Sequence, residues 1–233
     1  EGASSLSQPL ILVRLGQGST LDHIKLQDEA DHTTHLGLTL FRLDGQANVN
    51  SFSVSKGSQI TRMETHCFFA APDAQAAMSA VYLGCDNQHH DITTVVSHEY
   101  ADCKSRQLIR GVLDDKARGV FQGRVRVAPD AQKTDGQQMS RALLLSRDAE
   151  ADAKPELEIF ADDVVCSHGA TVGELDETLL FYLKSRGIDE AEARTMLIDA
   201  FLVDTLEEIS YQPFADFLRG HISGWTARQT GVE

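Results

Sequence analysis

A cysteine and a histidine two residues apart, Cys166 and His168, are the pair in this sequence best suited to metal or sulfur chemistry. Residues two apart in a β-strand point to the same side of the sheet, so the thiol and the imidazole would share a face. Thiolates and imidazoles bind soft metals, and a thiolate also attacks sulfur. The spacing alone is equally typical of two structural side chains, so both interpretations stay open.

The other cysteines and histidines give weaker signals. Three cysteines recur every 18 residues, namely Cys67, Cys85 and Cys103. They lack the tight C-x₂₋₄-C pair that zinc sites favour. His32 and His35 are close enough in sequence to share a metal, and His89 and His90 fall in a polar stretch. We expect ordinary buried thiols and surface histidines at these positions.

Several enzyme signatures do not occur in the sequence. It contains no GxxxxGK[ST] loop and no GxGxxG after a strand, the two glycine-rich turns that cradle nucleotide phosphates. It contains no GxSxG nucleophile elbow either. Asp162 and Asp163 could form a carboxylate pair, but a turn is the simpler interpretation. Any dependence on ATP would therefore have to come through a partner.

Charge is distributed unevenly along the 233 residues. Residues 1–147 carry 15 basic and 16 acidic side chains, whereas residues 148–233 carry 6 basic and 19 acidic ones. No basic surface is available to neutralise phosphates, which argues against nucleic-acid binding. The acidic second part could steer a basic protein partner. No run approaches the roughly 20 apolar residues that span a bilayer, and four cysteines in a chain this long suggest reduced thiols, so we expect a cytoplasmic protein.

Short alternating segments and turn clusters fill residues 16–171. Alternation is clear at residues 36–40, 124–127 and 156–159, as expected for half-buried strands. Polar turn clusters separate such segments at intervals that average about 14–15 residues. Strands at that interval with no helices between them fit either a sandwich or a coil of stacked strands, and periodicity cannot decide between the two.

The period becomes helical after Gly173. Gly187 is well placed to end a first helix, and Asp189 with Glu192 resembles a capping box that begins a second. Pro213 suits the start of a third helix, because its missing N–H costs nothing there. We therefore expect a β-rich body followed by helices over residues 176–225.

Long contiguous strings resemble one family. They are KPELEIFADDV at 154–164, CSHGATVG at 166–173 and LFYLKSRGI at 180–188, with FQGR at 121–124 and AQKTD at 131–135 upstream. These strings are similar to the SufB/SufD family of the Suf iron–sulfur cluster assembly system. The resemblance is dense from residue 84 to residue 209 and looser before that.

The resemblance implies a fold and a role. The fold is mainly β: a right-handed parallel β-helix core over residues 1–172, with a C-terminal α-helical subdomain over 173–233. The N-terminal helical region of the family is expected to be absent from this sequence. The role is that of a scaffold rather than an enzyme, pairing with SufB through the β-helix and docking the ATPase SufC through the C-terminal helices. The isolated chain is also expected to be capable of forming a homodimer.

Two departures from SufB point to the SufD branch of the family. SufB carries a cysteine where this chain has Met139, and a glutamate after the histidine where this chain has Gly169. The resemblance implies that His168 and Cys166 face SufB, and it makes them candidates for cluster assembly or metal binding. No cofactor is expected to stay bound to the chain alone, whereas iron or an iron–sulfur cluster could be held at the interface with SufB.

On the helical subdomain, six residues are the expected SufC contacts: Tyr182, Arg186, Ile188, Met196, Leu197 and Phe201. Two alternatives remain open for the whole chain. One is a β-helix enzyme acting on acidic polysaccharide, which would need carboxylates, calcium and a basic side chain in a groove. The other is a purely structural oligomerisation module, in which His168 would be dispensable.

Overall fold

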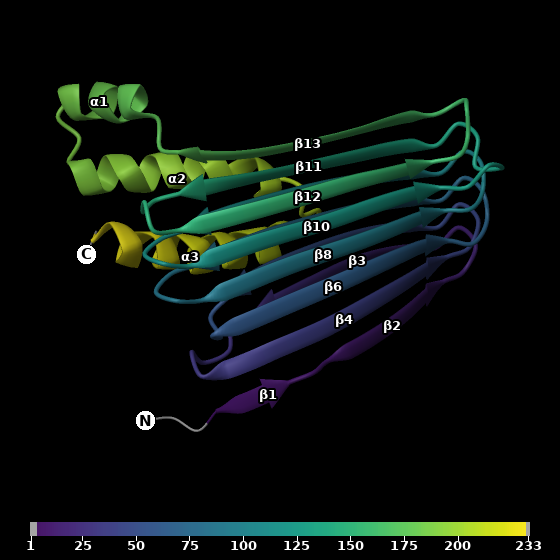
Figure 1. Cartoon of the computed structure of the whole chain (residues 1–233), viewed down its shortest axis with the longest axis horizontal. Coiled ribbons are helices and arrows are strands. Elements are labelled where there is room, and N and C mark those ends of the chain that lie inside the picture. Colours follow the sequence, from purple (N-terminus) through teal and green to yellow (C-terminus); the bar gives the residue numbers. More distant parts are fainter. Residues whose placement is uncertain (1–3, 232–233) are drawn as a thin grey trace.

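A coil of parallel strands dominates the computed structural model, which describes residues 4–231 (Figure 1). Sheet A follows the order β1-β4-β6-β8-β10-β12, with β2 also paired to β4, and sheet B follows β3-β5-β7-β9-β11-β13. Sheet A contains β1 (Ser5–Ser7), β2 (Leu10–Leu15), β4 (Thr33–Leu43), β6 (Ile60–Phe69), β8 (His89–His98), β10 (Arg118–Val127) and β12 (Glu150–Ile159). Sheet B contains β3 (Thr20–Gln27), β5 (Asn48–Lys56), β7 (Gln75–Gly84), β9 (Lys104–Leu113), β11 (Asp135–Leu144) and β13 (Val165–Glu174).

Consecutive strands alternate between the two sheets, so the chain winds as a parallel β-solenoid. From β2 on, each strand pairs in parallel with the strand two places along, as where Arg118 lies opposite His89, 29 positions earlier. Half of such a turn matches the interval between turn clusters in the sequence. The parallel pairing decides for the coil of stacked strands, and the sandwich alternative, which needs antiparallel sheets, is wrong.

Side chains that point into the solenoid form its core. Strand β4 shows the period of two, with every second residue from Thr33 to Leu43 buried. Tyr82 is among the largest buried side chains. A Cβ on Gly111 would lie 2.0 Å from Cζ of Tyr82, and one on Gly119 would lie 2.4 Å from its Cε2. Glycines on β9, the neighbouring strand, and on β10, in the opposite sheet, thus make room for the ring.

The corners between strands repeat one backbone conformation. Gln46, Asp73, Asp102 and Lys133 occupy equivalent corners and all have φ near +60°. Asparagine and aspartate tolerate this left-handed region better than most residues, which suits the aspartates here. Hydrogen bonds join each corner to the next turn, such as the one from Asp102 N to Gln132 O at 2.9 Å. The sequence clusters interpreted as turns are these corners.

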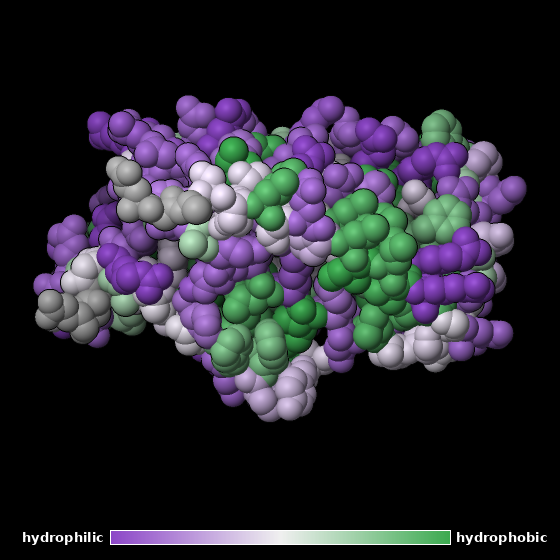
Figure 2. Space-filling view, turned by 90° about the horizontal axis from the view of Figure 1, so that it is seen from below, coloured by the Kyte–Doolittle hydropathy of each residue, from purple (hydrophilic) through white to green (hydrophobic). Residues whose placement is uncertain are grey.

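The first turn of the solenoid presents apolar side chains to solvent. Figure 2 shows the molecule from below, on the side where β1 and β2 lie in Figure 1, and green side chains gather there in a broad patch. Leu10 and Leu12 of β2 are exposed. A hollow of about 470 Å³ lies beside Leu12 and is also lined by Phe41 and Phe68. Apolar surface therefore remains open at this end of the solenoid.

Three helices follow the solenoid: α1 (Glu177–Ser185), α2 (Glu190–Leu206) and α3 (Gln212–Thr230). Asp189 caps α2 by accepting from Ala191 N, and Gly187 takes φ +87° just after α1, as the sequence predicted. Pro213 lies in the first turn of α3. The last strand runs two residues past the expected boundary at 172, because its final residues stay in register with β11.

Helices α2 and α3 pack on the outer face of sheet B. A cluster of buried apolar side chains fills this contact: Phe52, Val54, Val81, Leu83, Val112 and Leu143 from the sheet, with Ile198, Leu202, Leu206, Leu218, Ile222 and Trp225 among those from the helical part. Burial of one such side chain contributes about 1.5–3 kcal/mol. The helical part therefore shares a core with the solenoid.

The histidines differ from the expectation of surface positions. His35, His90 and His98 are buried, because the alternation of their strands points them into the solenoid. His90 Nδ1 lies 2.8 Å from Ser55 Oγ, and His98 Nε2 lies 2.8 Å from Ser105 Oγ. Burial lowers the pKa of His90 to about 3 and that of His98 to about 4, so both rings are neutral at neutral pH.

The C-terminal end of the solenoid as candidate functional site

The solenoid ends without a cap at β12 and β13. Within residues 4–231, each of these strands has a hydrogen-bonded neighbour on one side, β10 for β12 and β11 for β13. Residues that would be interior elsewhere in the coil lie open here: Ile159 keeps 40% of its surface exposed and Val172 keeps 46%. This end therefore presents two free strand edges and the apolar inside of the last turn.

Cys166 and His168 lie on the same face of β13, as their spacing predicted. They are opposite Gly136 and Gln138 of β11, which are buried in the interior, so both belong to the inward-facing row of the open end. Cys166 is half-buried, and a Cβ on Gly136 would lie 3.3 Å from its Sγ. Burial raises the pKa of the Cys166 thiol, which therefore stays protonated at neutral pH. His168 is exposed.

This pair alone is a small ligand set. Among residues 4–231 there is no group of three or more His, Cys, Asp or Glu side chains placed to hold a metal ion. Cys166 and His168 can supply one sulfur and one imidazole nitrogen, whereas four ligands are usual for iron–sulfur clusters and zinc. A metal or cluster at this end would need ligands from another chain.

The two positions that differ from SufB are direct neighbours. Met139 of β11 lies opposite Gly169 of β13. A Cβ on Gly169 would meet Met139 Cε at 3.0 Å and Sδ at 3.2 Å. A glutamate in place of Gly169 would crowd the methionine, so the two departures are consistent with one another.

A groove of about 640 Å³ lies beside this pair of residues, between the outer face of sheet B and the end of α2. Arg110 is buried in it, with its guanidinium 5.1 Å from the ring of Phe201 and 3.5 Å from the Asp204 carboxylate. Burial and the nearby Arg141 lower the pKa of Arg110, while Asp204 opposes them. Arg106 and Glu208 form a second ion pair at 3.1 Å. These contacts fasten α2 and the turn after it to β9, which is separated from β13 by β11 in sheet B.

The expected SufC contacts are spread over α1 and α2. Tyr182 and Met196 are exposed, and Arg186 lies over the Tyr182 ring at 5.2 Å. Ile188 and Leu197 are partly buried. These five residues leave a surface of mixed character on the side of the helices away from the sheet.

Phe201, the sixth expected contact, faces the other way. It packs against the cluster between the helices and sheet B, beneath Arg110. Leu179, which helical spacing predicts to share an apolar face with Leu180 and Leu183, is exposed on α1, and so is Phe181. Their exposure could not be seen in the sequence, because leucine and phenylalanine at helical spacing usually mark a buried face.

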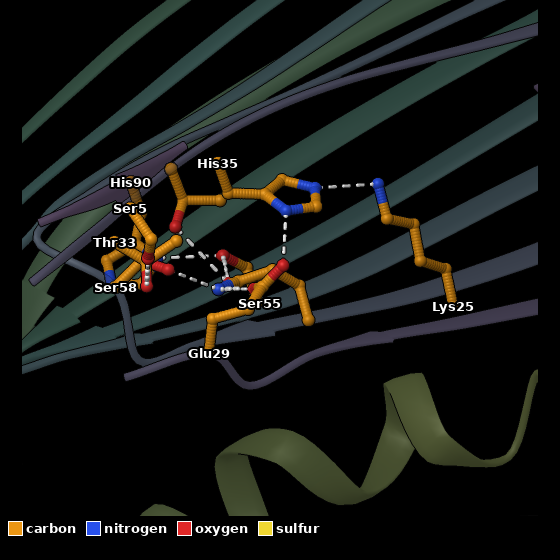
Figure 3. A network of polar contacts seen from close by, with 10 residues as sticks. Ser5, Lys25, Glu29, Thr33, His35, Ser55, Ser58 and His90 are labelled. Carbon is orange, nitrogen blue, oxygen red and sulfur yellow. Dashed lines mark hydrogen bonds and ion pairs between the residues drawn. The ribbon is translucent and has the colours of Figure 1, made fainter. Parts of the chain in front are cut away.

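The remaining sequence candidates lie apart. Cys67 and Cys103 are buried in the interior core, as expected, and Cys85 is half-buried. Asp162 and Asp163 form the corner before β13. His32 is exposed and His35 is buried, so the two do not share a site. His35 belongs instead to a polar network at the first turns of the solenoid, which the sequence did not reveal (Figure 3).

Comparison with known proteins gives the family. Residues 1–201 match the family described as SUF system FeS cluster assembly, SufBD core domain. The chain belongs to the SufB/SufD family. It is 37% identical over 197 residues to the iron–sulfur cluster assembly protein SufD of Escherichia coli, covering 84% of this chain and 47% of that protein.

Two further relatives agree with a SufD-type member of this family. The chloroplastic protein ABCI7 of Arabidopsis thaliana is 32% identical over 219 residues, which cover 94% of this chain and 46% of that protein. SufD of Bacillus subtilis is 37% identical over 129 residues, covering 55% of this chain and 30% of that protein. The chain spans about half the length, or less, of these relatives.

These relatives support a role in iron–sulfur cluster assembly, and the SufD proteins among them are named as assembly proteins. Over residues 4–231, none of the helices is both long enough and apolar enough to cross a bilayer.

Proposed function

We propose that this SufB/SufD-family chain is a scaffold subunit that pairs with SufB through β12 and β13 and docks SufC through its C-terminal helices. The uncapped end of the solenoid carries the first half of this proposal. Two parallel edge strands of ten residues each can continue into a partner's sheets by main-chain hydrogen bonds, as in other cases of strand addition. The exposed Ile159 and Val172 would be buried in the same event.

The exposed side of the helices supports the second half. Tyr182, Met196 and the neighbouring Phe181 are large apolar side chains in solvent, on a segment that is strongly acidic overall. Exposed apolar groups of this size mark interaction sites, and aromatic residues with arginine are common anchors in them. Because the chain has no phosphate-binding loop, ATP would act through SufC rather than on this chain.

His168 is the residue of this chain proposed to act on the cargo of the complex. In the paired state it would lie between the two solenoids, where its imidazole could ligate iron or relay a proton to a sulfur species. An imidazole ring nitrogen is a common metal ligand and a common proton carrier in proteins. Cys166 would contribute a second ligand at most, since its thiol is half-buried and protonated. Iron and sulfur would pass through this site as cargo of the assembly.

Co-purification tests the proposal directly. The chain would be co-expressed with untagged SufB and SufC, isolated through its own tag, and analysed for both proteins, iron and sulfide. Recovery of both partners is expected; absence of SufB would refute pairing through the open end. In the same complex, His168→Ala should leave assembly and thermal stability unchanged while cluster formation falls at least tenfold. Full cluster formation by that variant would remove His168 from the site.

A further inference from the structure

A lysine, a histidine and a glutamate form a connected row inside the first turns of the solenoid (Figure 3). Lys25 Nζ lies 3.0 Å from His35 Nε2, and His35 Nδ1 lies 2.7 Å from Glu29 Oε1. They come from β3, β4 and the segment between these strands. The three residues lie more than 120 positions before His168 in the chain and take no part in the proposed pairing with SufB.

The hydrogen bonds fix the role of each group. An ionised Glu29 can only accept, so the proton of the neutral imidazole must be on Nδ1. Nε2 of His35 then carries the lone pair, and the Lys25 amine donates to it. Gln27 Nε2 donates to the other oxygen of Glu29 and holds the carboxylate in place. In enzymes, a nucleophile is activated by a base that is hydrogen-bonded to it and oriented by a third group. Lys25, His35 and Glu29 have this arrangement.

The surrounding structure keeps space for this contact. A Cβ on Gly37 would lie 2.4 Å from Lys25 Nζ and 2.8 Å from His35 Nε2. Glycine at that position is therefore needed for the amine and the ring to meet. His35 is only 3% exposed, whereas Lys25 is half-buried on β3, the edge strand of sheet B. The amine is therefore more exposed to solvent than the ring.

Burial of the Lys25 amine favours its neutral form. Burial lowers the pKa of Lys25, although Glu29 opposes this. Burial likewise lowers the pKa of His35 and of the adjacent His23, so both rings are neutral at neutral pH and do not compete for Glu29 as cations. Burial alone would raise the pKa of Glu29, but hydrogen bonds from Gln27 and His35 hold it below its usual range.

We propose that Lys25 is a nucleophilic amine that forms an imine with small aldehydes, assisted by His35 and Glu29. The amine lone pair attacks the aldehyde carbon, and the C–N bond forms as the carbonyl π electrons move to oxygen. The proton released from nitrogen passes to His35 Nε2, and Glu29 stabilises the imidazolium. His35 passes that proton to the alkoxide oxygen, which gives a carbinolamine. His35 then accepts the second proton from nitrogen and delivers it to the hydroxyl group as the C–O bond breaks, so that one water leaves and the imine remains. No oxidant or reductant is consumed in these steps.

Reductive trapping tests this on the intact chain. Acetaldehyde is a suitable probe, because it is small enough for a half-buried amine. Cyanoborohydride reduces any imine to a stable N-ethyl lysine, and peptide mass mapping gives the rate at each lysine. The exposed Lys104 serves as the internal reference. Near pH 7, Lys25 should react several-fold faster than Lys104, because burial lowers the pKa of Lys25 and His35 accepts the proton that the reaction releases.

Variants separate activation from simple accessibility. Lys25→Arg should abolish the fast site and leave Lys104 unchanged. Glu29→Gln keeps the shape of the side chain and should slow Lys25 several-fold with Lys104 unaffected; His35→Gln should act likewise. Circular dichroism establishes that each variant is folded. Equal rates at Lys25 and Lys104 in the wild-type chain would overturn the proposal without any variant. A fast Lys25 unaffected in both folded variants would overturn the roles of His35 and Glu29.

Discussion

Val172 offers the sharpest test of pairing through the open end of the solenoid. It lies on the inward-facing row of β13 and keeps 46% of its surface exposed. Val165 is on the same strand, faces outward, and is 69% exposed. The two residues are of one type, and their strand alternation places them on opposite faces. Val172→Asp and Val165→Asp therefore introduce the same charge into the same strand on different sides.

The expected loss at Val172 can be worked from its exposure. Full burial of a valine side chain contributes about 1.5–3 kcal/mol, so burial of the remaining 46% contributes about 0.7–1.4 kcal/mol. An unpaired carboxylate in the interface costs about 1–3 kcal/mol more. The total of about 2–4 kcal/mol corresponds to SufB binding weakened by about 30-fold to 1,000-fold. For Val165→Asp we expect less than about a threefold change, as for most substitutions outside an interface core.

Titration calorimetry of each purified variant with SufB gives the dissociation constants. Thermal unfolding of the variants alone shows whether either substitution damages the fold. Wild-type affinity of both variants for SufB would refute the reasoning, because it would mean that the inward row of β13 is not covered by the partner. Equal and strong weakening by both variants would instead indicate a contact across the outer face of sheet B.

Two further predictions concern stability and the ATPase. In unfolding experiments, the free energy of unfolding should fall as the pH drops below about 6.5. Below that pH, His90 binds a proton in the unfolded chain, whereas in the folded chain its pKa of about 3 keeps it neutral. His90→Gln should flatten this fall by about 1.4 kcal/mol per pH unit. An unchanged slope in that variant would show that the buried His90 is not its cause. In SufC pull-downs, Met196→Asp should weaken binding at least about tenfold, whereas Phe217→Asp on the exposed side of α3 should leave binding unchanged. Weaker SufC binding by both variants, or by neither, would argue against the α1–α2 surface as the docking site.

The elements of this fold were readable from the sequence, but their winding was not. Turn clusters at half-turn intervals and the cap at Asp189 appear in the structure where the sequence put them. The choice of a coil over a sandwich came from the family resemblance, since both folds use strands of the same length and alternation. Local sequence does not specify which strand is adjacent to which, and that adjacency is what decides between them.

The candidate site was predictable in part for a similar reason. Cys166 and His168 are local, so a period of two was enough to place them on one face. The burial of His90 was missed because histidine in a polar stretch suggests solvent, and only the register of β8 turns it inward. Contacts such as Lys25 with His35 cross the interior between strands of opposite sheets, β3 and β4, and local periodicity contains no information about such pairs.

The apolar cluster under α2 and α3 has a consequence for how the molecule opens. Each turn of a solenoid rests on the turns before and after it, so stability is distributed along the coil instead of being concentrated in one centre. The helices stabilise several turns at once, because their apolar side chains pack against side chains of β5, β7, β9 and β11. Among the described residues 4–231, no member of that cluster lies on β12 or β13. The last turn is therefore the first part expected to fray, and a protein that covers it would fold the final turn and bind it in a single step.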